Sequence, residues 1–309
     1  MSTAMSSAVV DSPRELVAVP IVGLIGDDPL VFPLYIDTGK GRHVLYKDAR
    51  SDFDESTCRR LQSEGVERVF ILSTDRRSYH QRAEERLDAL LKDRSLGVEA
   101  RGEVLYGVAG EMAADLLATP PDAPRIERAS RVMSATASLL LREPKAMSVL
   151  RRVMQAGADL RRHSLTVGFL SMGLARHVLG ADPTTLVQAG LAGMLHDVGK
   201  VGFEDDGDDP DHTTRGAKLL HGLGMPQDIC DAAMYHHERT DGSGFPRGLR
   251  GTQIPELARV VGLVNTFDKV YASQQPRVGV FDALRIVAQV YRGCFDERLA
   301  VGLVTMFKS

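Results

Sequence analysis

The spacing of apolar residues changes near residue 95, and this change constrains the fold more than any other feature. Before it, short apolar runs alternate with Gly, Asp and Pro, a pattern typical of strands. After it, apolar residues recur with the period of a helix. We predict strands at 16–19, 31–36, 43–46 and 68–72, helices at 55–64 and 79–92, and no element in the small, polar residues 1–12. The fold class is therefore α+β, a small N-terminal α/β module (1–95) followed by an all-α helical bundle (96–309).

Length, charge and cysteine content restrict the function classes. The chain has 309 residues, enough for two domains, and a net charge of −3, which lacks the basic surface of proteins that bind nucleic acid polymers. Its three cysteines show no paired spacing, which indicates reduced thiols. Since we find no secretory signal and no apolar run long enough to span a membrane, we expect a cytoplasmic protein with no membrane partner.

Histidines and acidic residues gather in one part of the helical region. Seven of the nine histidines lie between residues 163 and 237. Asp159 and His163 are four residues apart in a predicted helix, which places them on one face. The other positions stand at predicted helix ends: His196-Asp197 closes an apolar helix, His212 opens the next, and His236-His237 closes another.

This combination of residue types predicts a metal site. Imidazole nitrogens and carboxylate oxygens are preferred ligands of iron, manganese and zinc. In a His-Asp pair the imidazole can bind one ion while the carboxylate bridges to a second, and two ions can clamp a phosphodiester. A single helical histidine is more often an ordinary surface or core residue, which is our interpretation of His43, His80, His177 and His221.

Two sequence segments resemble a known family. Residues 191–202, LAGMLHDVGKVG, resemble the core motif of HD hydrolases. Residues 236–255, HHERTDGSGFPRGLRGTQIP, resemble the signature loop of the HD-GYP family. The resemblance runs from about residue 145 to the end, and the first 95 residues stand where the family carries a variable regulatory module. It implies a bacterial signalling hydrolase, a phosphodiesterase that converts cyclic di-GMP to pGpG or GMP with a binuclear centre of iron or, alternatively, manganese.

The resemblance also implies roles for individual residues. The family's metal-ligand positions fall on His163, His196, Asp197, His212, His236 and His237. Lys200 falls on the lysine that contacts the substrate phosphate, so that Lys200 and Asp197 are the expected catalytic residues. A lysine cation suits the negative charge that develops on a phosphorane.

Two departures concern the loop and the last ligand. The signature loop reads Gly244-Phe245-Pro246, with phenylalanine in place of tyrosine, so the ring is kept and a hydroxyl is lost. In relatives this loop is linked to docking of GGDEF domains, which makes such proteins expected partners. Asn265 aligns with an aspartate ligand, and a neutral amide should bind metal more weakly. Asp268, three residues later, is a candidate compensating ligand or substrate-binding residue.

Two further departures concern the substrate and the number of ions. An Arg-Pro-Tyr-Arg run of the family is absent, which leaves Arg277 for a phosphate or guanine contact. Asp159 stands where relatives with a third metal often have glutamate, and its shorter side chain favours two ions over three.

Two functions are consistent with these residues. The intact histidine and aspartate positions favour an active phosphodiesterase. The departures at Asn265 and near Arg277 favour a degenerate protein that binds metal, and with it cyclic di-GMP or a related cyclic dinucleotide, and signals through protein contacts. An HD hydrolase acting on another nucleotide is a third reading, against which the signature loop argues. The N-terminal module shows no catalytic spacing.

Overall fold

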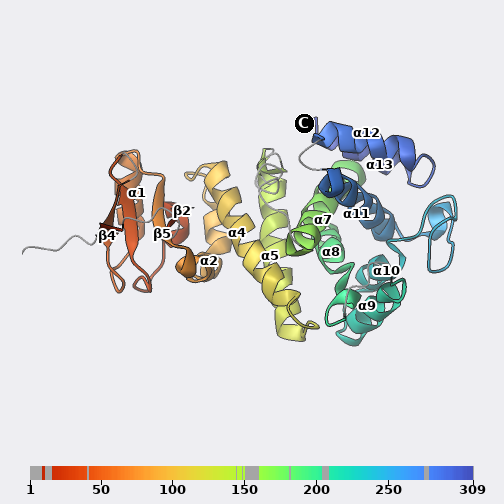
Figure 1. The fold of residues 1–309 in the computed structure, drawn as a ribbon, viewed down its shortest axis with the longest axis horizontal. Coiled ribbons are helices and arrows are strands. Elements are labelled where there is room, and N and C mark those ends of the chain that lie inside the picture. Colours follow the sequence, from red (N-terminus) through yellow and green to blue (C-terminus); the bar gives the residue numbers. More distant parts are fainter. Residues whose placement is uncertain are drawn as a thin grey trace, which may run out of the picture. The chain divides into compact units, whose positions relative to one another are not determined.

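The computed structural model describes most of the chain as two compact units, residues 1–111 and 112–309 (Figure 1). The boundary lies within helix α4 (Val98–Leu116), and the predicted domain boundary near residue 95 stays a prediction. The described residues are 9–10, 16–39, 42–143, 145–147, 149, 160–180, 182–203, 209–274 and 278–308.

The first unit contains an antiparallel sheet of five strands in the order β1-β4-β3-β5-β2. Its strands are β1 (Val9–Val10), β2 (Leu16–Pro20), β3 (Leu34–Asp37), β4 (His43–Lys47) and β5 (Arg68–Leu72). All four predicted strands are present. The second begins later than predicted, after Pro33, which cannot donate a backbone hydrogen bond. The expectation of no element in residues 1–12 is wrong, because Val9–Val10 pair with β4 through the backbone.

Helices α1 (Glu55–Ser63), α2 (Arg76–Glu85) and α3 (Leu87–Lys92) accompany the sheet. The predicted single helix at 79–92 is wrong, since the chain leaves helical geometry at Arg86 and starts again at Leu87. This break buries two separate apolar faces, one with Tyr79 and Ala83 and one with Leu87, Leu90 and Leu91.

The regular elements described in the second unit are helices, apart from one isolated β-bridge between Asp241 and Arg250, which confirms the α+β class. Its helices are α5 (Ala123–Arg142), α7 (Leu160–Leu174), α8 (Pro183–Leu195), α9 (Asp211–Gly222), α10 (Gln227–Tyr235), α11 (Glu256–Gln274), α12 (Val280–Val290) and α13 (Glu297–Met306). The apolar spacing also predicts a helix at 145–160, and this range lies largely outside the described residues. Over the part of the chain that the structure describes, no helix combines the length and apolar character needed to cross a membrane.

Helix α8 lies at the centre of this unit, packed against α5, α7, α10 and α11. It begins at Asp182, whose carboxylate accepts hydrogen bonds from the backbone of Thr184 and Thr185, and Pro183 fits its first turn. Gly193 allows close contact with α7, because a Cβ there would lie 2.7 Å from the Val167 carbonyl oxygen. The end of α8 is thereby held in the interior of the unit.

Candidate metal centre

His196 and Asp197 follow directly after α8, and both side chains are buried. A short 3₁₀ turn, Val198–Lys200, comes next and lies against the start of α9. Gly199 is required there, because a Cβ at this position would lie 2.0 Å from the His212 carbonyl oxygen. The HDVGK segment therefore brings His196 and Asp197, which follow α8, beside the first turn of α9.

Four histidines have their Nδ1 atoms engaged by acceptors. The Nδ1 of His163 lies 2.7 Å from Asp268 Oδ2, and that of His196 lies 2.7 Å from the Gly193 carbonyl. The Nδ1 atoms of His212 and His236 contact the carbonyls of Asp209 and Ala233. Since carbonyl and carboxylate oxygens only accept, each Nδ1 carries a proton, and in the neutral imidazole the lone pair then lies on Nε2, the tautomer of a metal ligand.

The free Nε2 atoms converge on one carboxylate. Asp197 Oδ1 lies 3.1 Å from His212 Nε2 and 3.5 Å from His236 Nε2, while Oδ2 lies 3.3 Å from His196 Nε2. Two potential ligand groups share Asp197, and within each group the ligand atoms lie within 4.8 Å of one another. The groups are Asp197, His212, His236, His237 and His163, His196, Asp197.

This arrangement fits divalent metal ions. Among the described residues, the Nε2 atoms of His163, His196, His212 and His236 and the Oδ1 of Asp197 are buried without a hydrogen-bond partner. Buried polar atoms without a partner are costly, and a cation bound among these lone pairs satisfies them together. Asp197 is common to both potential ligand groups.

The electrostatics of the cluster keep its donors ready to bind metal. Burial lowers the pKa of His196 and lowers that of His236 to about 4, so both imidazoles are neutral near pH 7. The pKa of His237 is also lowered, chiefly by burial and then by the neighbouring His236. Burial alone would raise the pKa of Asp197, but the surrounding imidazoles hold it well below its ordinary value. Asp197 is therefore ionised, and His196, His236 and His237 are neutral near pH 7.

The signature loop is attached to the same cluster. The Phe245 ring stacks on His237, with ring centroids 4.5 Å apart and an interplanar angle of 17°. Glu238 is buried, and its carboxylate accepts hydrogen bonds from the backbone of Arg247 at 2.7 Å and Leu249 at 2.9 Å. Our sequence analysis did not single out Glu238. The sequence feature that could have identified Glu238 is its position between the His-His pair and a glycine-rich loop. The backbone N–H groups of such a loop need an acceptor, and an acidic residue can supply one.

Helix α11 contributes two further predicted residues. Asp268 is buried and oriented toward His163, so in this structure it holds a predicted ligand histidine in place. Asn265 is buried, and its Oδ1 has no hydrogen-bond partner within the described part of the chain, as expected of an amide oxygen available to a cation. Asp159 and Arg277 lie outside the described residues.

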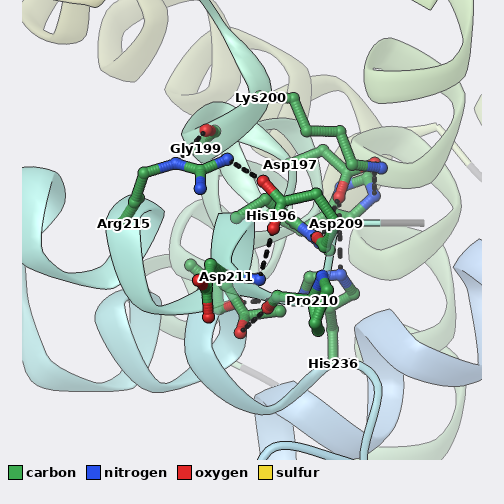
Figure 2. A network of polar contacts seen from close by, with 12 residues as sticks. His196, Asp197, Gly199, Lys200, Asp209, Pro210, Asp211, Arg215 and His236 are labelled. Atoms are coloured by element: carbon green, nitrogen blue, oxygen red, sulfur yellow. Dashed lines mark hydrogen bonds and ion pairs between the residues drawn. The ribbon is translucent and has the colours of Figure 1, made fainter. Parts of the chain in front are cut away.

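Lys200 and Arg215 form polar contacts beside the histidine–aspartate cluster (Figure 2). Lys200 Nζ lies 2.7 Å from Asp197 Oδ2, and its side chain is one-quarter exposed. Arg215 forms an ion pair with Asp209 and donates to the Gly199 carbonyl at 3.2 Å. Neither Arg215 nor Asp209 was predicted, because in the sequence both are ordinary charged residues, and the contacts that join them to each other and to Gly199 appear only in the fold.

Comparison with known proteins agrees with this geometry. Residues 175–299 match the HD domain family, a range that includes every predicted ligand position except Asp159 and His163. The chain is 31% identical over 187 residues to a cyclic di-GMP phosphodiesterase of Pseudomonas aeruginosa, an alignment that covers 55% of this chain and 45% of the relative. It is 32% identical over 133 residues to a cyclic di-GMP phosphodiesterase of Thermotoga maritima, covering 38% of this chain and 36% of that relative. The chain thus spans less than half the length of these relatives.

A solved structure shares the fold over nearly the whole chain. It is described as an HDG"Y"P protein from Bdellovibrio bacteriovorus, with a TM-score of 0.67, 19% identity, and coverage of 96% of this chain and 100% of that chain. This chain therefore matches, over residues 175–299, the class that the helical fold and the histidine–aspartate cluster define, the HD domain. Within that class its resemblance to the HD-GYP family is confirmed.

Proposed function

We propose that this chain is a metal-dependent phosphodiesterase of HD-GYP type that hydrolyses cyclic di-GMP to pGpG or GMP. The observation that carries the proposal is the set of buried histidine Nε2 atoms that converge on Asp197 with their lone pairs free. The names of the relatives add the substrate class, a cyclic dinucleotide. Such a ligand is anionic, and Lys200 beside Asp197 offers a cation at the site.

The residues assigned to the metals divide between the two groups. His163 and His196 would hold one ion, and His212, His236 and His237 the other, with Asp197 shared. Asn265 and Asp159 are additional candidate ligands. Two divalent ions, iron or alternatively manganese, would supply positive charge for the phosphodiester oxygens and would activate water.

The chain's own residues support hydrolysis around that chemistry. Asp197 keeps its negative charge in a buried position, so it can hold cations where the scissile phosphate must bind. Lys200 is partly exposed, and its ammonium group can balance charge that develops on phosphate oxygens. Arg277 and Asp268 remain candidates for substrate contacts, although Asp268 has its Oδ2 engaged by His163.

The exposed side of the Gly244-Phe245-Pro246 loop is the proposed surface for GGDEF-domain partners. Phe245 is 37% exposed while its ring stacks on His237. A partner that covers the exposed face of this ring would therefore contact a residue that touches a ligand histidine.

Metal analysis of anaerobically purified protein, coupled to a cyclic di-GMP hydrolysis assay on the same sample, tests the proposal. We expect about two equivalents of iron or manganese and formation of pGpG. His221→Ala serves as the matched control, because this exposed histidine lies outside both ligand groups. Bound metal without turnover would favour the alternative, a degenerate signalling protein weakened by its neutral Asn265. Absence of bound metal after reconstitution would contradict both.

A further inference from the structure

Arg215 and Asp209 form an ion pair at the edge of the metal-ligand cluster (Figure 2). Asp209 stands two residues before α9, and Arg215 lies in the first half of that helix. Their side chains are 33% and 29% exposed. Both residues touch segments that carry ligands.

Asp209 determines the direction of the His212 ring. Its backbone carbonyl accepts the hydrogen bond from His212 Nδ1, and its Oδ1 accepts from the Asp211 backbone at 2.9 Å. With Nδ1 held in this way, the opposite ring atom, Nε2, lies 3.1 Å from Asp197 Oδ1. A shift of the Asp209 carbonyl would therefore rotate a ligand nitrogen away from the cluster.

Arg215 connects that segment to the turn after His196-Asp197. Its Nε donates to the Gly199 carbonyl at 3.2 Å, while Nη2 contacts the Asp209 carboxylate. The guanidinium also lies over the Phe203 ring, 4.2 Å from its centroid. One planar cation thus holds two ligand-bearing segments together, which a single-point ammonium group cannot do in the same way.

We propose that Arg215 and Asp209 are positioning residues that set His212 against Asp197 and thereby raise the affinity of the centre for metal. This inference rests on the proposed metal centre. It adds a role to residues that no ligand assignment includes. Groups that orient ligands typically change metal affinity roughly 10–100-fold when they are removed.

A comparable ion pair elsewhere provides a matched control. Arg259 on α11 pairs with Asp296, with side chains 15% and 21% exposed, and neither residue is in a ligand group. Arg259→Met removes a partly buried arginine–aspartate pair of the same kind. The Arg259→Met variant therefore measures the general effect of losing such an ion pair on stability, without a change near His212.

The experiment measures the affinity for Mn²⁺ by competition with a chelator in the full chain and its variants. We expect Arg215→Met to weaken Mn²⁺ binding roughly 10–100-fold and Arg259→Met to change it less than about twofold. Arg215→Lys should restore part of the loss, because it keeps the charge but not the fork of donors. Asp209→Asn should cost less than Arg215→Met, because it keeps a side-chain oxygen as an acceptor and leaves the hydrogen bond from Arg215 to the Gly199 carbonyl in place.

Several outcomes would overturn the inference. One is equal Mn²⁺ affinity in Arg215→Met and the wild type, and another is an equal loss in Arg259→Met. Circular dichroism shows whether each variant folds. If Arg215→Met does not fold, Arg215→Lys and Asp209→Asn are compared with Arg259→Met by the same criterion. If the wild-type chain itself binds no Mn²⁺ or iron, the proposed function fails as well, which separates the two failures.

Discussion

His80 in the first unit and His236 in the second are both buried histidines, but their surroundings differ. Both side chains are almost fully buried, and in both cases burial lowers the pKa to about 4. His80 lies against Gly107, where a Cβ would be 2.3 Å from its Nε2, and its Nδ1 is 3.6 Å from Glu111. It fills space between α2 and α4.

His236 differs in what surrounds it. Its Nδ1 is held by the Ala233 carbonyl, and its Nε2 faces Asp197 together with the Nε2 atoms of His196 and His212. A lowered pKa by itself therefore does not identify a functional histidine. Convergence of several donors on one buried carboxylate does, because only that arrangement offers a cation a complete set of ligands.

The largest predicted effect comes from removing the shared carboxylate. Asp197→Ala should abolish binding of both ions, with an affinity loss of about 100-fold or more, since both ligand groups contain Asp197. His163→Ala should release one ion and leave the other, because His163 belongs to one group only. Metal analysis after dialysis checks both. Loss of the same number of ions in the two variants would show that Asp197 does not bridge.

The next largest effect is expected in the pH dependence of folding stability, through His80. Its folded pKa is about 4 against an ordinary 6.5, so the unfolded chain binds the proton first as the pH falls. Stability is therefore lost between about pH 6.5 and pH 4, on the order of 2–3 kcal/mol for this group. His80→Phe should flatten that part of the profile. Denaturant unfolding at pH 7.5 and pH 5 measures it, and an unchanged pH dependence in the variant would contradict the prediction.

A smaller effect is expected at Asn265. Asn265→Asp places a negative charge where a buried amide oxygen lacks a partner among the described residues. We expect metal to be held about tenfold more tightly, roughly 1.4 kcal/mol. Chelator competition checks this, with Asn265→Ala as the variant that removes the oxygen. Identical affinity in all three proteins would show that residue 265 is not a ligand.

The smallest effect is expected at Phe245. Phe245→Tyr keeps the ring that stacks on His237 and adds a hydroxyl to a partly exposed side chain, so the free energy of unfolding should change by less than about 0.5 kcal/mol. Phe245→Ala, which removes the stacking, is the informative comparison. A large destabilisation by tyrosine would show that the ring edge is tightly enclosed.

Much of the architecture is determined by local patterns in the sequence. The short apolar runs of the first unit, bounded by Gly, Asp and Pro, and the helical periodicity of the second predict their classes, because side-chain spacing follows directly from backbone geometry. The positions of His196, His212 and His236 at helix ends were predicted for the same reason. The break at Arg86 was not, since it depends on how two apolar faces pack rather than on their period.

Tertiary structure alone decided how the donors are oriented. Nothing in the sequence indicates that Asp268 holds His163, that Glu238 holds the signature loop, or that Arg215 joins Asp209 to Gly199. These contacts join residues far apart in the chain or at irregular spacing, where no local preference acts. The sequence determined which ligand types are available, and the packing of α7, α8, α9 and α11 determined where their lone pairs meet.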